Sequence, residues 1–163
     1  MGRNAGGVRA ILLEKDDEVV SMELDIDQQR KMLVITENGF GKRTPLAEYR
    51  LQTRGGKGVA TYDKTKFGKT GLLVGATIVN DEDEVMVINS NGVIIRIRAN
   101  EVSTSGRTTQ GVKIMKVEKD NCIVSFAKVV DEDSAENAGK AKGGNADKNP
   151  NVGVDGSEQM TLV

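Results

Sequence analysis

The fold is decided by the stretch Gln52-Thr53-Arg54-Gly55-Gly56-Lys57-Gly58-Val59. Its skeleton is an arginine, three further residues and then Gly-Val. This skeleton occurs three times, at Arg3…Gly7-Val8, Arg54…Gly58-Val59 and Arg107…Gly111-Val112. The arginines are 51 and 53 residues apart. A pattern that returns at nearly one interval is typical of repeated supersecondary units, so the chain is predicted to consist of copies of one unit.

Each copy contains short apolar segments separated by turn residues, and no longer stretch of the body has a helical period. Two hairpin turns, Asn38-Gly39 and Asn91-Gly92, lie 53 residues apart, and Asn-Gly is a strong signal for a tight β-turn. Pro45 is expected to end a strand, because it has no N–H for a sheet hydrogen bond. The predicted strands are residues 8–13, 19–24, 32–36, 40–44, 58–62, 72–79, 84–88, 93–98, 111–115 and 122–127. The sequence therefore predicts an all-β, propeller-like fold made of four-stranded blade repeats.

The interval divides the chain into four parts. Residues 1–53 and 54–106 are predicted to be two blade-like repeats, residues 107–130 a partial third repeat, and residues 131–163 a disordered tail. Residues 1–130 hold 20 Lys and Arg against 17 Asp and Glu, whereas residues 131–163 hold 3 against 7. A mildly basic body thus carries an acidic tail.

Composition excludes several functions. The chain has no His and only one Cys, which removes the commonest general base, the commonest transition-metal ligand and any internal disulfide. No catalytic constellation and no metal or cofactor site is expected, so the chain is not predicted to be an enzyme by itself. No apolar run is long enough to span a bilayer. Aromatic residues make up only 3% of the chain, so the core is expected to be aliphatic.

Basic residues recur at matching places of the repeat and are the candidate binding residues. They are the boundary arginines and their neighbours, and the cations of two equivalent strands: Arg3, Arg54, Lys57, Arg107 and Lys113, with Lys42, Arg43, Arg96 and Arg98. If the units surround an axis, equivalent cations form a stripe that suits the evenly spaced phosphates of duplex DNA. Alternatively, the arginines clasp one blade to the next in a structural or protein-interaction module. The pattern alone leaves both interpretations open.

A longer stretch of the sequence resembles a known family. The segments Val34-Ile35-Thr36-Glu37-Asn38-Gly39-Phe40-Gly41-Lys42-Arg43-Thr44-Pro45, Glu48-Tyr49-Arg50 and Gln52-Thr53-Arg54-Gly55-Gly56-Lys57-Gly58 closely resemble the C-terminal domain of DNA gyrase A subunits. The A subunit of topoisomerase IV is the nearest competitor. The resemblance covers about residues 3–130.

This resemblance implies a partial β-pinwheel, a propeller-like ring of which the chain holds two full units and part of a third. It implies a C-terminal piece of a type II topoisomerase subunit that binds and wraps duplex DNA. It adds Arg50 to the candidate DNA contacts. It also identifies a glycine-box-like segment of Gln52, Arg54, Gly55, Gly56, Lys57 and Gly58, in which Thr53 departs from the Gln-Arg-Arg-Gly-Gly-Lys-Gly pattern.

The implied partners are double-stranded DNA and, in the whole enzyme, the A-subunit core and the ATPase subunit. The implied location is the bacterial cytoplasm, at the nucleoid. An incomplete ring would leave open blade edges through which two copies can pair.

The charge difference between body and tail gives a first testable prediction. An acidic tail can compete with DNA phosphates for the basic body, so deleting residues 131–163 is expected to tighten duplex binding. The measurement is the dissociation constant of a labelled duplex at low salt. Equal affinity with and without the tail would contradict the prediction.

Overall fold

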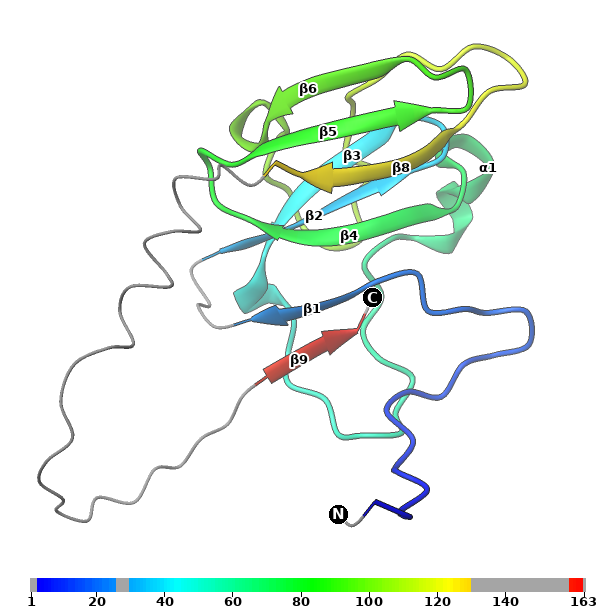
Figure 1. Ribbon diagram of the computed structural model, residues 1–163, viewed down its shortest axis with the longest axis vertical. Coiled ribbons are helices and arrows are strands. Elements are labelled where there is room, and N and C mark those ends of the chain that lie inside the picture. The colour runs from blue at the N-terminus through cyan, green and yellow to red at the C-terminus, as the bar shows by residue number, and fades with distance from the viewer. Residues whose placement is uncertain (1–2, 26–29, 130–158, 163) are drawn as a thin grey trace, which may run out of the picture.

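The computed structural model describes residues 3–25, 30–129 and 159–162, and most of the regular structure is antiparallel β-sheet (Figure 1). The all-β prediction is therefore confirmed. The strands are β1 (Met22–Asp25), β2 (Lys31–Thr36), β3 (Phe40–Pro45), β4 (Leu73–Val79), β5 (Glu84–Asn89), β6 (Ile94–Arg98), β7 (Val112–Lys113), β8 (Ile123–Lys128) and β9 (Gln159–Leu162). The helical elements are single turns: η1 (Leu46–Glu48), η2 (Lys64–Lys66), α1 (Phe67–Thr70) and η3 (Ala99–Glu101).

The strands form three sheets with the orders β4-β2-β3-β7, β6-β5-β8 and β1-β9. The first two sheets each centre on a hairpin from one repeat, β2–β3 or β5–β6. Their outer strands come from later repeats: β4 pairs with β2, β7 with β3, and β8 with β5. Each sheet therefore combines strands from different parts of the repeat pattern. The boundaries predicted at residues 54 and 107 describe the period of the sequence.

Both hairpins turn at the Asn-Gly pairs. Gly39 and Gly92 have φ angles of 79° and 77°, in the left-handed region where a side chain would be strained. At Gly39 a Cβ atom would also lie 2.1 Å from the Met115 carbonyl oxygen. β3 ends at Pro45, and the turns η1 and η3 follow the two hairpins at equivalent places. The repeat seen in the sequence is thus a repeat of hairpin followed by a helical turn.

The structure differs from the predicted strands at two places. Residues 8–13 and 58–62 contain no extended strand, and Ile11 forms only an isolated bridge to Gly56. These apolar segments lie along loops, where single backbone groups find partners but no neighbouring strand continues the ladder. The tail predicted for residues 131–163 lies mostly outside the described residues. Its described part, β9, pairs antiparallel with β1.

The core is mainly aliphatic, as the composition predicts, with Phe40 and Tyr62 as its buried aromatic residues. β2 is buried on both faces: Leu33 and Ile35 join a cluster with Val85 and Val87 of β5, while Met32 and Val34 face a second cluster around Tyr62. The first cluster connects the two larger sheets, which overlap in the view of Figure 1. Burial of each such side chain stabilises the fold by about 1.5–3 kcal/mol. Across the part of the chain that the structure describes, no helix is long and apolar enough to cross a membrane.

Candidate nucleic-acid interface

Lys42 on β3 has no exposed surface. Its Nζ donates hydrogen bonds to the carbonyl oxygens of Thr61 at 2.6 Å, Gly106 at 3.1 Å and Arg107. The ammonium also lies 4.3 Å from the centroid of the Tyr62 ring, close enough for a cation–π contact. Lys42 therefore ties the first repeat to the second repeat and to the loop at the start of the third.

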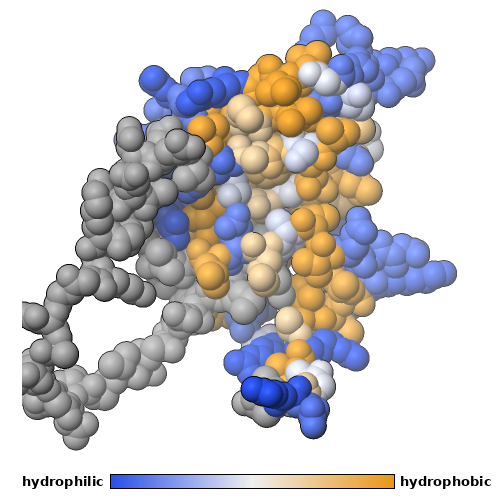
Figure 2. Space-filling model, in the orientation of Figure 1, coloured by the Kyte–Doolittle hydropathy of each residue, from blue (hydrophilic) through white to orange (hydrophobic). Residues whose placement is uncertain are grey.

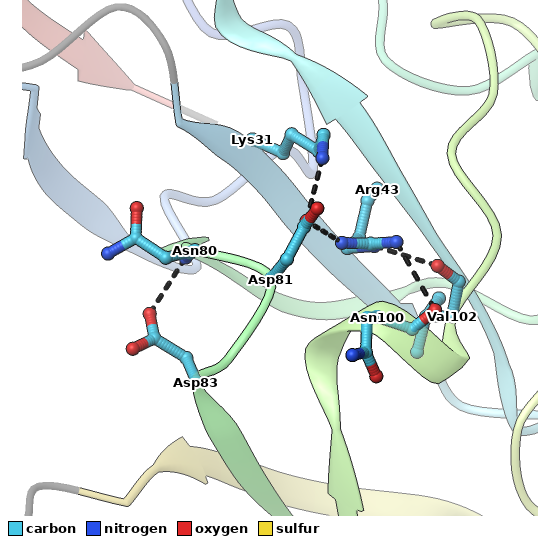
Figure 3. Close-up of polar contacts among 7 residues, drawn as sticks. All are labelled: Lys31, Arg43, Asn80, Asp81, Asp83, Asn100 and Val102. Atoms are coloured by element: carbon cyan, nitrogen blue, oxygen red, sulfur yellow. Dashed lines mark hydrogen bonds and ion pairs between the residues drawn. The ribbon is translucent and has the colours of Figure 1, made fainter.

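Arg43, the next residue, makes a second clasp (Figure 3). Its Nε donates to the Val102 carbonyl at 2.7 Å, its Nη2 donates to the Asn100 carbonyl at 3.3 Å, and its Nη1 pairs with Asp81. Lys31 donates to the same carboxylate at 2.6 Å. The hydrogen bond from Lys31 and the charges of both cations hold the pKa of Asp81 below its usual range.

These placements correct the interpretation of Lys42 and Arg43 as surface cations. Strand alternation should expose one of two consecutive residues, but β3 is covered on both faces. Its outer edge is also covered, because the Arg43 N–H donates to the Ser103 carbonyl at 3.1 Å and the Arg43 carbonyl accepts from the Ser105 N–H at 2.8 Å. Both side chains are consequently removed from any surface that could meet phosphate, and for them the structure favours the clasp.

The equivalent cations of the second hairpin are exposed. Arg96 pairs with Glu84 across the β5–β6 ladder, and the Arg98 Nε lies 3.9 Å from the same carboxylate. Their side chains remain 57% and 66% exposed. A shared carboxylate reduces the net charge that this strand offers to a polyanion.

The glycine-box-like segment, Gln52–Gly58, is a loop that docks against the N-terminal segment. The Gly55 N–H donates to the Ala10 carbonyl at 2.9 Å, and the Leu12 N–H donates to the Gly56 carbonyl at 2.8 Å. Gly55 and Gly58 have φ angles of 76° and 77°, so glycine suits both positions. The Gln52 amide donates to the carbonyls of Arg50 and Leu51 at 3.2 and 3.0 Å. The cations of this segment and its flank, Arg50, Arg54 and Lys57, are exposed, as is Arg3.

Arg107 is half-buried beside the clasp of Lys42. Its Nη1 donates to the Ala60 carbonyl at 3.1 Å, its backbone N–H donates to Glu48 at 3.3 Å, and its guanidinium lies 6.0 Å from the Tyr49 ring centroid. The guanidinium has one carbonyl partner and one aromatic neighbour, and part of the side chain remains accessible to solvent. Arg107 thus joins the second repeat to the start of the third while its side chain stays partly accessible.

Three lysines in η2 and α1, which the repeat pattern does not single out, connect these separate cations. Lys64 lies 3.6 Å from Glu14, whose other carboxylate oxygen lies 3.5 Å from Lys57. Lys66 donates to the Thr108 carbonyl at 3.3 Å, next to Arg107 in the chain. Lys69 and Lys113 lie 5.9 and 5.5 Å from the centroid of the Phe40 ring. We call the resulting set the basic band: Arg54, Lys57, Lys64, Lys66, Lys69, Arg107 and Lys113.

The sequence contained a signal for these lysines, three of them within six residues of one loop. The repeat did not reveal it, because the loop is longer than its counterparts and the lysines have no equivalents. Only the fold of residues 63–71 into a pair of short helical turns shows that they bridge the boundary cations of the second and third repeats.

Comparison with known proteins identifies the family of the chain. The family model "DNA gyrase C-terminal domain, beta-propeller" matches residues 1–24, 30–80 and 83–129. The chain is 43% identical over 134 residues to the DNA gyrase A subunit of Staphylococcus epidermidis (strain ATCC 12228), covering 82% of the chain and 15% of that protein. It is 47% identical over 136 residues to the DNA gyrase A subunit of Kosmotoga olearia, covering 81% and 16%. The chain thus spans about a sixth of the length of these relatives.

Solved structures show the same fold. The structure of a DNA gyrase A C-terminal domain aligns with a TM-score of 0.58 and 27% identity, covering 64% of this chain and 35% of that one. The C-terminal domain of a DNA topoisomerase IV aligns with a TM-score of 0.72 and 23% identity, covering 82% and 43%. The second likeness shows the fold alone, and the first agrees with the sequence matches. Given its strands, its repeated hairpins and these matches, the chain belongs to the family of DNA gyrase C-terminal, beta-propeller domains.

Proposed function

We propose that the chain binds duplex DNA as the non-catalytic DNA-binding and wrapping part of a type II topoisomerase A subunit. Family membership supports the general role. The observation that supports contacts between this chain and DNA phosphates is the basic band, in which lysines of one loop lie between the boundary cations of two repeats. In the longer protein, the A-subunit core and the ATPase subunit would be its partners, and the bacterial nucleoid its place of action.

The electrostatics of the basic band suit phosphate. Lys57 and Lys64 have side chains that are 71% and 75% exposed, and both lie at the outer limit of an ion pair with Glu14. Exposed pairs of this kind contribute about 1 kcal/mol or less. A DNA phosphate can therefore take the place of the carboxylate at little cost. Contacts to phosphate carry no sequence information, so we expect binding that tolerates any duplex sequence.

The direct test is duplex binding measured by fluorescence anisotropy across a salt series. Each neutralised phosphate contributes a slope of about −0.9 in a plot of log K against log salt. The exposed cations of the basic band are expected to give a slope steeper than about −3. A flat dependence on salt, or tighter binding to single strands than to duplex, would sink the proposal.

The clasps of Lys42 and Arg43 favour a second candidate, a structural or protein-interaction repeat module. Both residues join repeats and neither reaches the surface. This role is compatible with DNA binding by other residues, so the salt series also separates the two candidates. If the folded protein fails to bind duplex DNA at low salt, only the interpretation as a structural or protein-interaction module remains.

A further inference from the structure

The outer edge of β3 is completed by the third repeat. β7 pairs with it through Gly41↔Val112 and Phe40↔Lys113, and the Ile114 N–H donates to the Gly39 carbonyl at 2.9 Å. The approach is close, because a Cβ on Gly111 would lie 2.4 Å from the Gly41 carbonyl oxygen. As a result, Phe40 is only 9% exposed.

The equivalent edge of the second hairpin is open. β6 is the last strand of its sheet within the described residues. Val93 and Ile94, which correspond to Phe40 and Gly41 at a spacing of 53 residues, are 50% and 56% exposed. Figure 2 shows hydrophobic side chains at the top of the molecule, where Figure 1 places β6, and further ones down the same face. Such an edge can template the addition of another strand.

The chain also carries a copy of the segment that would fit. Gly7-Val8-Arg9 corresponds to Gly111-Val112-Lys113, and Arg3 to Arg107. Gly7 has a φ angle of 74° and Gly111 one of 78°, so both glycines have the same left-handed backbone. At Gly111 a Cβ atom would collide with the neighbouring strand β3, so only glycine fits there. Nothing lies within 4 Å of a Cβ atom placed on Gly7. Residues 3–10 are all exposed, with Val8 at 59%.

The Gly7–Arg9 segment, which we call the donor strand, and the outer edge of β6, which we call the acceptor edge, cannot meet within one molecule in this arrangement. Figure 1 places the N-terminal segment at the opposite end of the molecule from β6. We propose that the outer edge of β6 binds the Gly7–Arg9 strand of a second copy of the chain, in the way that β3 binds β7. Charge favours this pairing. Glu48 accepts the backbone N–H of Arg107, and its equivalent on the acceptor side is the exposed Glu101, opposite the place that Arg3 of the incoming copy would take.

Such a contact is heterologous, because different surfaces of the two copies meet. Each added copy leaves one donor and one acceptor free unless the assembly closes. Sedimentation of the full chain across a concentration series is therefore expected to show a mass that rises from monomer to dimer and beyond. A mass that stays monomeric at the highest soluble concentration overturns the proposal.

Two variants separate the two surfaces. Val8→Pro removes the donor N–H and is expected to weaken self-association about tenfold or more, with no change in melting temperature. Val19→Pro is its matched control, because Val19 is 49% exposed and lies outside the donor strand. Ile94→Asp places a carboxylate on the acceptor edge, where the side chain is exposed, and should be equally damaging.

Mixing the two variants gives the sharpest readout. Val8→Pro keeps its acceptor and Ile94→Asp keeps its donor, so an equimolar mixture is expected to form a dimer that grows no further. A Val8→Pro variant that self-associates like the wild type, together with an Ile94→Asp variant that does not, would mean that β6 pairs with β6 and would overturn the proposal. A mixture that stays monomeric while the wild type assembles would also overturn it.

Discussion

Replacing Lys42 by methionine is expected to lower the free energy of unfolding by about 1–3 kcal/mol, because one buried and two partly buried carbonyl groups lose their donor and an unsatisfied buried group costs about 1–3 kcal/mol. Methionine fills a similar volume, so the change removes the ammonium and leaves little cavity. The three carbonyls belong to Thr61, Gly106 and Arg107. The loss should therefore loosen the junction where three repeats meet.

Chemical denaturation of the wild type and the Lys42→Met variant measures this effect. Lys119→Met is the matched control, since Lys119 is exposed and its replacement is expected to change stability by less than about 0.5 kcal/mol. A Lys42→Met variant as stable as the wild type would contradict the prediction. That result would mean that the cost of burying the ammonium equals the value of its hydrogen bonds.

The pH dependence of the same difference is expected to follow the titration of Lys42. Burial lowers the pKa of Lys42 from its ordinary value of 10.5 to about 8; nearby Lys66 and Arg107 add to this shift, and Glu48 opposes it. Between these two pKa values the unfolded chain still holds the proton that the folded protein has released. The stability difference between wild type and Lys42→Met is therefore flat below about pH 8, rises with pH up to about 10.5, and is flat again above that.

Removing three charges from the basic band is expected to have the largest effect on DNA binding. The variant Arg54→Gln/Lys57→Gln/Lys64→Gln changes only exposed side chains. At about 0.1 M monovalent salt each lost phosphate contact weakens binding about tenfold, which follows from the release of one counterion per contact. We therefore expect a loss of about a hundredfold or more, and a salt slope shallower by about 2 to 3.

A second triple variant, Arg96→Gln/Arg98→Gln/Lys119→Gln, is the control with the same change of net charge. Two of its cations share the Glu84 carboxylate, so its affinity and salt slope are expected to change little. Thermal unfolding of both variants checks that each remains folded. Equal losses in the two variants would mean that net charge, and not the basic band, governs binding.

Much of the architecture follows from local sequence. Asn38-Gly39 and Asn91-Gly92 have the backbone freedom that a hairpin turn needs, and Pro45 ends β3 because it cannot donate to a ladder. The continuous aliphatic runs Met32–Ile35 and Val85–Ile88 predict β2 and β5 as core strands. The interval between the Arg…Gly-Val skeletons predicts repeated units, and the motifs from Val34 to Gly58 predict the family. These features depend on neighbours within a few residues, so they can be identified without the fold.

The sequence by itself therefore determined the β class, the two hairpins, the repeat and the family, because turn geometry and short apolar runs are local. Only the tertiary structure decided what each repeated cation does. Arg43 and Arg96 occupy the same place in the repeat, yet Arg43 is a buried clasp and Arg96 is exposed beside Glu84. The physical reason is coverage: residues 103–105 of the second repeat lie along the edge of β3 at Arg43, whereas the edge of β6 is open within the described residues. Whether a charged side chain is buried depends on which distant segment covers it, and a repeat pattern carries no information about that.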